Sequence, residues 1–205
     1  MLLDPEDCQL VLIDYQARLM PAMAESSFVL ANALRLAQFA QAFEVPAWGT
    51  EQAPDKLGQN PQALRDLCRR TIAKQHFSAC AEGLADLLRP PARVRPVQGG
   101  NARSLPKHLQ KAVPAPVAPE RNTILLAGCE THVCLMQTAL ELLELEFDVW
   151  VVTDACSSRT ERNRDAAFDR LAANGAELVT TEMVAFEWLR TAEHENFRAV
   201  QALIN

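Results

Sequence analysis

The sequence is short of positive charge and of long apolar runs, and each shortage excludes a class of protein. It has 20 Lys and Arg residues against 26 Asp and Glu, a formal net charge of -6. This balance argues against nucleic acid as a partner, because binding phosphates takes an excess of basic side chains. No uncharged apolar run approaches the roughly 18 residues of a membrane span. The first ten residues, MLLDPEDCQL, are too acidic for a signal peptide. We therefore expect a soluble protein that binds neither nucleic acid nor membrane.

Paired-cysteine and nucleotide-binding motifs are also missing. The six cysteines include no CxxC pair. They fit neither a disulfide framework nor a zinc knuckle, and we expect a reducing, cytoplasmic location. No GxGxxG pattern follows Asp14 or Gly128, which disfavours a dinucleotide-dependent oxidoreductase. With 205 residues, 49% of them hydrophobic, the chain can bury a substantial core. We expect one domain over residues 1–205.

Short apolar runs alternate with helical patterns along the chain. Strands are predicted at residues 8–13, 44–50, 71–74, 122–127, 147–153 and 176–180. Helices are predicted at residues 26–42, 61–69, 78–88, 134–145, 161–174, 183–189 and 193–203. This alternation predicts an α/β three-layer sandwich of the Rossmann-like kind, with about six mainly parallel strands and helices on both faces.

A proline-rich excursion interrupts this pattern at residues 89–121. It holds seven of the 12 prolines and the Gly99-Gly100 pair. A loop of this length is unusual inside a domain. We expect at most a short helix there, near residues 104–111, and a role for the excursion in mobility or subunit contacts.

The stretch NTILLAGCETHVC, residues 122–134, places a cysteine after a buried strand. Gly128 breaks the strand, and helical spacing begins at about Cys134. A thiol at a helix start lies among free N–H groups at the positive end of the dipole, and both favour the thiolate. Cys134 is therefore a candidate nucleophile. Simple burial is the alternative, since the chain has five other cysteines and this residue type is often buried.

Two more reactive residues follow predicted strands. Asp14 comes after the first strand and Lys74 ends the third. Ligands of open parallel sheets bind at the carboxyl ends of the strands, where these side chains would meet Cys134. A carboxylate can accept the proton of a thiol, and an ammonium can stabilise the thiolate. Taken singly, Asp14 is as readily a turn cap and Lys74 a solvated charge.

Three segments together resemble the isochorismatase-like cysteine hydrolase family. They are LVLIDYQ, AKQHFSAC and AGCETHVCLMQTALELLELEFDVWVVTDACSSR, in consistent order over nearly the whole chain. The segment TEQAPDKLGQNP, residues 50–61, is similar to the subgroup of isochorismatase domain-containing proteins. The excursion at 89–121 departs from the family pattern, so its role is not inherited.

The resemblance implies a triad of Asp14 as base, Lys74 as positive partner and Cys134 as nucleophile. It also implies a cis peptide bond between Cys129 and Glu130, which aims the N–H groups of Glu130 and Cys134 at an oxyanion. A cysteine nucleophile favours hydrolysis of a small amide-like substrate through a thioester. In true isochorismatases, which cleave a vinyl ether, that position need not be cysteine.

The resemblance also bears on cofactors. Nicotinamidases of this fold carry a metal on an Asp-x-His pattern after the second strand, where this chain reads WGTEQ, residues 48–52. We expect no metal and no cofactor.

Other candidates are less specific. The substrate-pocket candidates are Tyr15, Gln16, Gln52, Phe77 and His132. Packing is the alternative for the aromatic side chains, solvation for Gln52, and a Cys-His dyad ranks below the pairing with Asp14. Such families commonly associate, so we expect a homo-oligomer. The competing interpretation is an oligomeric interaction or structural protein that keeps the scaffold with a vestigial site.

Overall fold

The computed structural model describes residues 2–89 and 121–204 and is built on a six-stranded sheet. The strand order is β3-β2-β1-β4-β5-β6, and every neighbouring pair is parallel. The strands are β1 (Cys8–Ile13), β2 (Ala47–Gln52), β3 (Arg70–Lys74), β4 (Thr123–Gly128), β5 (Asp148–Val152) and β6 (Glu177–Val179). The predicted parallel α/β fold is confirmed. The order reverses between β1 and β4, which places the topological switch point there.

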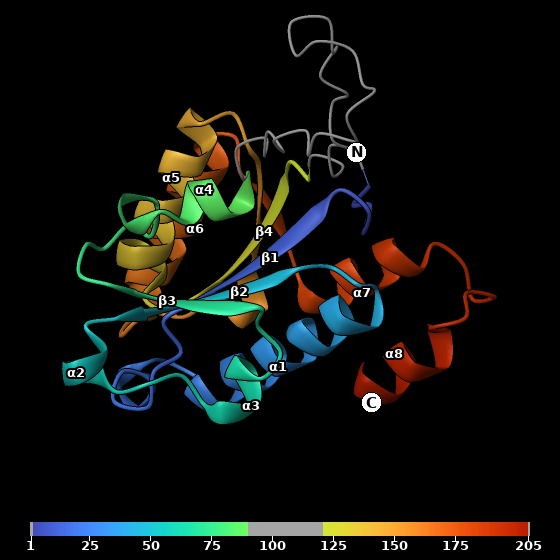
Figure 1. Ribbon diagram of the computed structural model, residues 1–205, viewed down its shortest axis with the longest axis horizontal. Coiled ribbons are helices and arrows are strands. Elements are labelled where there is room, and N and C mark those ends of the chain that lie inside the picture. The colour runs from blue at the N-terminus through green and yellow to red at the C-terminus, as the bar shows by residue number, and fades with distance from the viewer. Residues whose placement is uncertain (1, 90–120, 205) are drawn as a thin grey trace, which may run out of the picture.

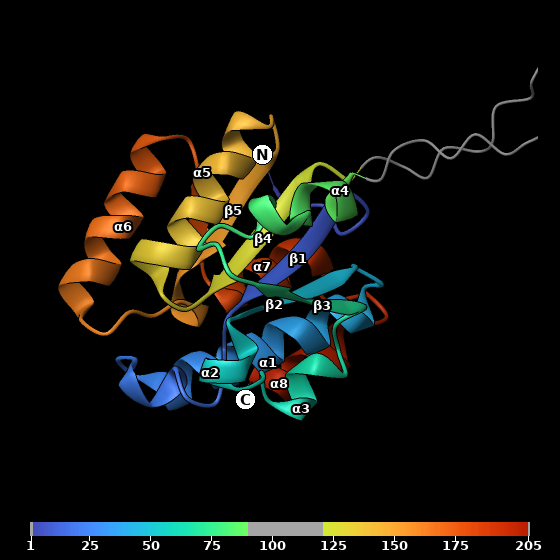
Figure 2. The same cartoon turned by 60° about the vertical axis from the view of Figure 1, so that its left-hand side comes forward.

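Helices cover both faces of the sheet. They are α1 (Ser26–Ala42), α2 (Pro54–Leu57), α3 (Gln62–Arg65), α4 (Leu84–Leu88), α5 (Met136–Glu144), α6 (Glu161–Ala173), α7 (Thr181–Leu189) and α8 (Phe197–Ile204). Figures 1 and 2 show α4, α5 and α6 on one face, and α1, α7 and α8 on the other. For the helices that connect strands, this split follows from right-handed crossovers, since the chain moves one way from β1 to β3 and the other way from β4 to β6.

The two central strands, β1 and β4, correspond to the two continuous apolar runs in the sequence. Every residue of β1 and of β4 is buried, because helices cover both faces of a parallel sheet. Their register pairs Leu10 with Leu125 and Ile13 with Gly128. Gly128 lies so close to β1 that a Cβ there would be 2.4 Å from the Ile13 carbonyl oxygen. The two strands therefore end side by side, at the edge where the candidate site lies.

Two elements differ from the sequence-based expectations in an instructive way. The second strand begins at Ala47, after Pro46, because proline cannot donate to the ladder. The helix expected at 78–88 is divided into a 3₁₀ turn, Cys80–Glu82, and α4. Gly83 separates the two pieces in the left-handed conformation, with φ of 86°.

The helix predicted at 26–42 is present with those bounds, the others are present with shifted ends, and α3 is shorter than the helix expected at 61–69. The short helix expected near 104–111 lies outside the described residues. Over residues 2–89 and 121–204, none of the helices combines the length and the apolar character that crossing a membrane requires.

Candidate active site

The carboxyl ends of β1 and β3 bring Asp14 and Lys74 into contact. Asp14 directly follows β1 and Lys74 is the last residue of β3, while β2 lies between the two strands. Lys74 Nζ lies 2.8 Å from Asp14 Oδ2, and neither side chain has exposed surface. Two strand ends more than 50 residues apart in the sequence thus supply a buried ion pair.

The two oxygens of Asp14 are used differently. Oδ1 accepts a hydrogen bond of 2.7 Å from Thr50 Oγ1, on the neighbouring strand β2. Oδ2 is in ion-pair contact with Lys74 but, among the described residues, has no partner in hydrogen-bond geometry. Asp14 itself adopts a left-handed conformation, with φ of 56°. The carboxylate is therefore held by one oxygen and keeps a lone pair of the other for a proton.

Cys134 lies in a π-helical turn, Thr131–Leu135, that precedes α5. Its side chain is buried, and its thiol donates to Gln52 Oε1 over 3.9 Å. Burial, and then the negative charge of Asp14, raise the pKa of the Cys134 thiol to about 12 against the opposing effect of Lys74. The expectation that the helix start favours a thiolate is wrong for the resting protein. Cys134 is a neutral thiol near pH 7 and needs a base.

The backbone before Cys134 has an unusual course. The peptide bond between Cys129 and Glu130 is cis. The N–H of Cys129 donates to the Ile13 carbonyl and that of Thr131 to the Ser157 carbonyl. The Glu130 N–H between them donates to no group among the residues that the structure describes. One backbone donor is thus left free next to the turn that carries the cysteine.

Gln52, the last residue of β2, joins Lys74 to Cys134. Its Oε1 accepts a 2.6 Å hydrogen bond from Lys74 Nζ and also faces the thiol. Gln16 holds the backbone of Gln52 from both sides, since Gln16 Oε1 accepts from Gln52 N at 2.7 Å and Gln16 Nε2 donates to Gln52 O at 3.0 Å. Gln52 is therefore part of the site, whereas Gln16 is a fully buried support beneath it.

Two other pocket candidates, Tyr15 and Phe77, have different surroundings in the structure. Tyr15 is fully buried, and its hydroxyl donates to the carbonyl of Ala155, so it supports the fold and does not line a pocket. Phe77 is 53% exposed, and its carbonyl accepts a 3.0 Å hydrogen bond from Lys74 Nζ. Its carbonyl therefore contacts the site while its residue surface stays largely exposed.

Among the described residues, His132 forms no hydrogen bond with Cys134. Its Nδ1 lies 2.9 Å from Ser158 Oγ, and its Nε2 lies 3.4 Å from Glu130 Oε2. Arg159 Nε approaches the same carboxylate at 2.7 Å. His132 thus belongs to a cluster with Glu130, Arg159 and Ser158.

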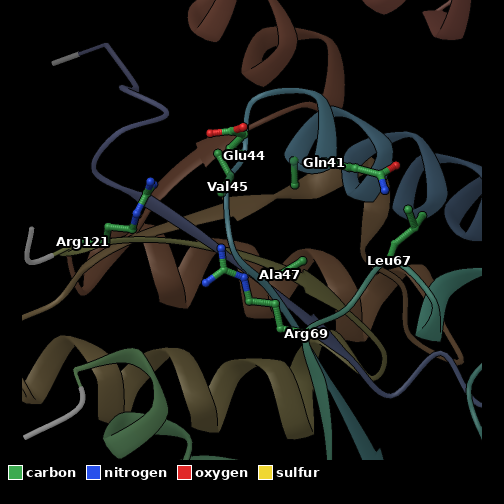
Figure 3. Close-up of a pocket in the computed structure, with 8 residues that line it drawn as sticks. Gln41, Glu44, Val45, Ala47, Leu67, Arg69 and Arg121 are labelled. Carbon is green, nitrogen blue, oxygen red and sulfur yellow. The ribbon is translucent and has the colours of Figure 1, made fainter. Parts of the chain in front are cut away.

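Two hollows among the described residues lie away from Asp14, Lys74 and Cys134. Figure 3 shows one of about 510 Å³ at the opposite edge of the sheet, beside the beginnings of β2 and β3. Its lining residues are Ala40, Gln41, Glu44, Val45, Ala47, Leu67, Arg69 and Arg121. Another, of about 420 Å³, lies between α1 and α6 and includes Asp154 and Arg164. Neither of these hollows contains the reactive groups, and the candidate site is defined by their geometry.

Sequence reasoning missed Thr50, which fixes the orientation of Asp14. No local motif singles it out, because its role comes only from the parallel register that pairs it with Ile13. In the part of the chain that the structure describes, no three His, Cys, Asp or Glu side chains gather as a metal site.

Comparison with known proteins adds to this geometry. The sequence model of the isochorismatase domain matches residues 111–183. The chain is 30% identical to mouse isochorismatase domain-containing protein 2A over 200 residues, which cover 98% of this chain and 84% of that protein. The chain belongs to the isochorismatase family.

Solved structures of similar fold include two above 25% identity to this isochorismatase-family chain. One is titled MAR1 ribonuclease, from Caenorhabditis elegans, with a TM-score of 0.81, 26% identity, and coverage of 100% of this chain and 92% of that one. The other is the YcaC gene product of Escherichia coli, titled an octameric hydrolase of unknown specificity. Its TM-score is 0.77 at 28% identity, over 98% of this chain and 88% of that one.

Proposed function

We propose that this isochorismatase-family protein is a metal-independent cysteine hydrolase of small amide-like substrates. The observation that carries the proposal is the placement of the Cys134 thiol beside the buried pair of Asp14 and Lys74, with Gln52 bridging thiol and ammonium. A nucleophile, a base and a cation in one site are the parts that acyl transfer through a thioester requires. Family membership supports hydrolysis as the reaction class.

In the first half-reaction Asp14 removes the thiol proton while the sulfur attacks the carbonyl carbon. The pKa of about 12 means that a free thiolate is scarce at neutral pH, so proton transfer accompanies attack. Oδ2 is the accepting atom because it is the oxygen without a hydrogen bond among the described residues. Lys74 offsets the negative charge that then forms on sulfur. Collapse of the tetrahedral species breaks the C–N bond, and protonated Asp14 returns its proton to the leaving nitrogen.

The tetrahedral oxygen takes its hydrogen bonds from the backbone. The free N–H of Glu130 supports this role, together with the N–H of Cys134 on the following turn. Donors held in place before the reaction contribute about 3 to 4 kcal/mol each to lowering such a barrier.

The second half-reaction releases the product. Asp14 takes a proton from water, the resulting hydroxide adds to the thioester carbonyl, and the C–S bond breaks. The proton on Asp14 then returns to sulfur, which leaves the carboxylic acid and the resting thiol. Asp14 thus accepts and returns each proton that is transferred in the two half-reactions.

A panel of small amides and esters tests the proposal on wild type, Cys134→Ser and Asp14→Asn. Cys68→Ser is the matched control, because Cys68 lies outside the site. We expect kcat/KM of the two site variants to fall by at least about a thousandfold, as for other removed nucleophiles. Acid quenching during wild-type turnover should leave an acyl group on the Cys134 peptide, which mass spectrometry detects. Full turnover by Cys134→Ser would refute the mechanism.

A homo-oligomer is a separate proposal. The Escherichia coli neighbour is titled octameric, and several large apolar side chains of this chain are at least 45% exposed. These side chains are Leu2, Phe28, Phe77, Leu145, Met183 and Phe186. Light scattering after chromatography measures the assembly. An oligomer without turnover on any of the amides or esters would favour the alternative of a structural protein with a vestigial site.

We also propose a reducing compartment such as the cytoplasm. All six cysteines are free thiols, which supports this location. A relative of shorter match, 42% identical over 86 residues, is named a secreted isochorismatase effector of Phytophthora sojae. Fractionation of the cells that make the protein would decide between the two locations.

A further inference from the structure

The side-chain amide of Gln52 is fixed at both of its ends. Its Nε2 donates a 2.7 Å hydrogen bond to the Gln75 carbonyl, and its Oε1 accepts from Lys74 Nζ at 2.6 Å. The orientation of the amide is determined by chemistry, because an ammonium only donates and a carbonyl only accepts. Gln52 thus has a defined place beside Lys74 and is not a solvated loop residue.

The ammonium of Lys74 has its three donors occupied. They donate to Gln52 Oε1 at 2.6 Å, to the Phe77 carbonyl at 3.0 Å and to the His76 carbonyl at 3.4 Å, while the Asp14 carboxylate is an ion-pair partner at 2.8 Å. A lysine has three N–H groups, so this set leaves none for the sulfur of Cys134. In the resting protein the positive charge lies near the thiol while its hydrogen bonds go elsewhere.

The thiol proton also goes to Gln52. Cys134 donates to Gln52 Oε1 over 3.9 Å, and Asp14 Oδ2 accepts no hydrogen bond among the described residues. One amide oxygen therefore receives both the thiol proton and an N–H of Lys74. A neutral acceptor in this place favours the thiol, because a thiolate would face the negative end of the amide dipole.

We propose that Gln52 is a positioning residue, whose side-chain oxygen holds the Lys74 ammonium and the Cys134 proton and thereby keeps the nucleophile in its thiol form until attack. The inference rests on the proposed function for the role of Cys134 as nucleophile. The arrangement itself is tested without any turnover.

Removal of the oxygen should make the sulfur more reactive. In Gln52→Met the thiol loses its acceptor, and one N–H of Lys74 becomes available to the thiolate. The charged groups that act on the thiol are Asp14 and Lys74, and both stay in place. Gln52→Glu keeps an oxygen but adds a negative charge, and Lys74→Met removes the positive charge. These two variants should therefore make the sulfur less reactive.

The experiment measures alkylation of Cys134 by iodoacetamide at several pH values from 7 to 10, followed on the Cys134 peptide by mass spectrometry. We expect Gln52→Met to react about tenfold faster than wild type at each pH, equal to a shift of about one pH unit. Gln52→Glu and Lys74→Met should react several-fold more slowly. The control Gln62→Met, on the exposed face of α3, should match wild type.

The signs of these effects distinguish positioning from loosened packing. A loosened site would react faster in all three site variants, including Gln52→Glu and Lys74→Met, and would also label buried Cys156. That outcome, or a Gln52→Met rate within twofold of wild type, would overturn the inference. If Gln52→Met fails to fold, a Gln52→Glu rate at or above wild type overturns it equally. An expected set of rates without amide turnover would support the inference and contradict only the proposed function.

Discussion

Asp14 and Lys74 form an ion pair without exposed surface, although each belongs to the end of a different strand. Nζ and Oδ2 are 2.8 Å apart. Removing both charges from water is costly, and the pair is stable only because each partner has the other and further polar contacts. Thr50 supplies one such contact to Asp14, and Gln52 and Phe77 supply others to Lys74. The pair thus links the reactive groups to the stability of the fold.

Breaking this pair on one side should destabilise the protein strongly. Lys74→Met leaves the carboxylate of Asp14 buried without its cation, and we expect a loss of about 3 to 5 kcal/mol in the free energy of unfolding. The double variant Asp14→Asn with Lys74→Met should recover much of that loss, since no charge remains buried. Urea unfolding followed by circular dichroism measures both. Lys56→Met, at an exposed position, is the control and should change stability by less than about 0.5 kcal/mol. A double variant no more stable than Lys74→Met would show that charge is not the cause.

Two glycines of the sheet should respond differently to the same methyl group. A Cβ at Gly128 would lie 2.4 Å from the Ile13 carbonyl oxygen, which is part of the backbone and cannot rotate away. A Cβ at Gly49 would lie 3.1 Å from Thr71 Oγ1, a side-chain atom that can. We expect Gly128→Ala to cost about 3 kcal/mol or more and Gly49→Ala about 1 kcal/mol. Thermal unfolding of the two variants side by side checks the order, and equal losses would contradict the close approach of β1 and β4.

The sequence predicts most of the sheet because its central strands are buried on both faces. β1 and β4 are nearly continuous apolar runs, which is the pattern of strands buried on both faces. Gly128 ends the second run because β4 lies too close to Ile13 there for a side chain. The ends of helices and strands are harder to predict where a single residue sets the backbone conformation. Gly83 divides the helix expected at 78–88, and the left-handed conformation that does so is visible only in the structure.

The candidate site was predictable in its reactive groups but not in its contacts. Asp14, Lys74 and Cys134 follow strands, and parallel topology alone brings such positions to one edge. The part of Gln52 depends on which way its side chain points, and the neutral state of the thiol depends on how deeply it is buried. Neither property has a local signature, because both arise from residues distant in the sequence.

Buried thiols should make the protein sensitive to alkaline pH. Burial raises the pKa of Cys156 from an ordinary value of 9.0 to about 12. The unfolded chain therefore loses this proton from about pH 9, while the folded protein keeps it up to about pH 12. Stability is full below pH 9 and falls above it, by up to about 1.4 kcal/mol per pH unit for each such thiol. Urea unfolding at pH 7, 9 and 10 should show a constant value and then a decline.

A variant without this thiol isolates its contribution. Cys156→Ala should be less stable than wild type at pH 7 because of the small cavity, but should lose about 1 kcal/mol less between pH 9 and pH 10. Val152→Ala makes a cavity in the same region of the chain without removing a titrating group. It should therefore keep the wild-type slope, and an unchanged slope in Cys156→Ala would contradict the assignment.

Gln9 joins the two ends of the proline-rich excursion to the sheet. Its Nε2 donates to the carbonyl of Leu88 at 2.8 Å and to that of Arg121 at 3.0 Å, and its Oε1 accepts from Trp48 Nε1 at 3.1 Å. Gln9→Met keeps the length of this buried side chain and removes all three bonds. Three polar groups then lose a partner, at about 1 kcal/mol or more each, so we expect a loss of about 3 kcal/mol. The same change at exposed Gln62 should leave stability unaltered.

Because Gln9 is at the opposite edge of the sheet from Cys134, the iodoacetamide rate of Cys134 in Gln9→Met should equal that of wild type. A faster rate would mean that the two edges of the sheet are coupled.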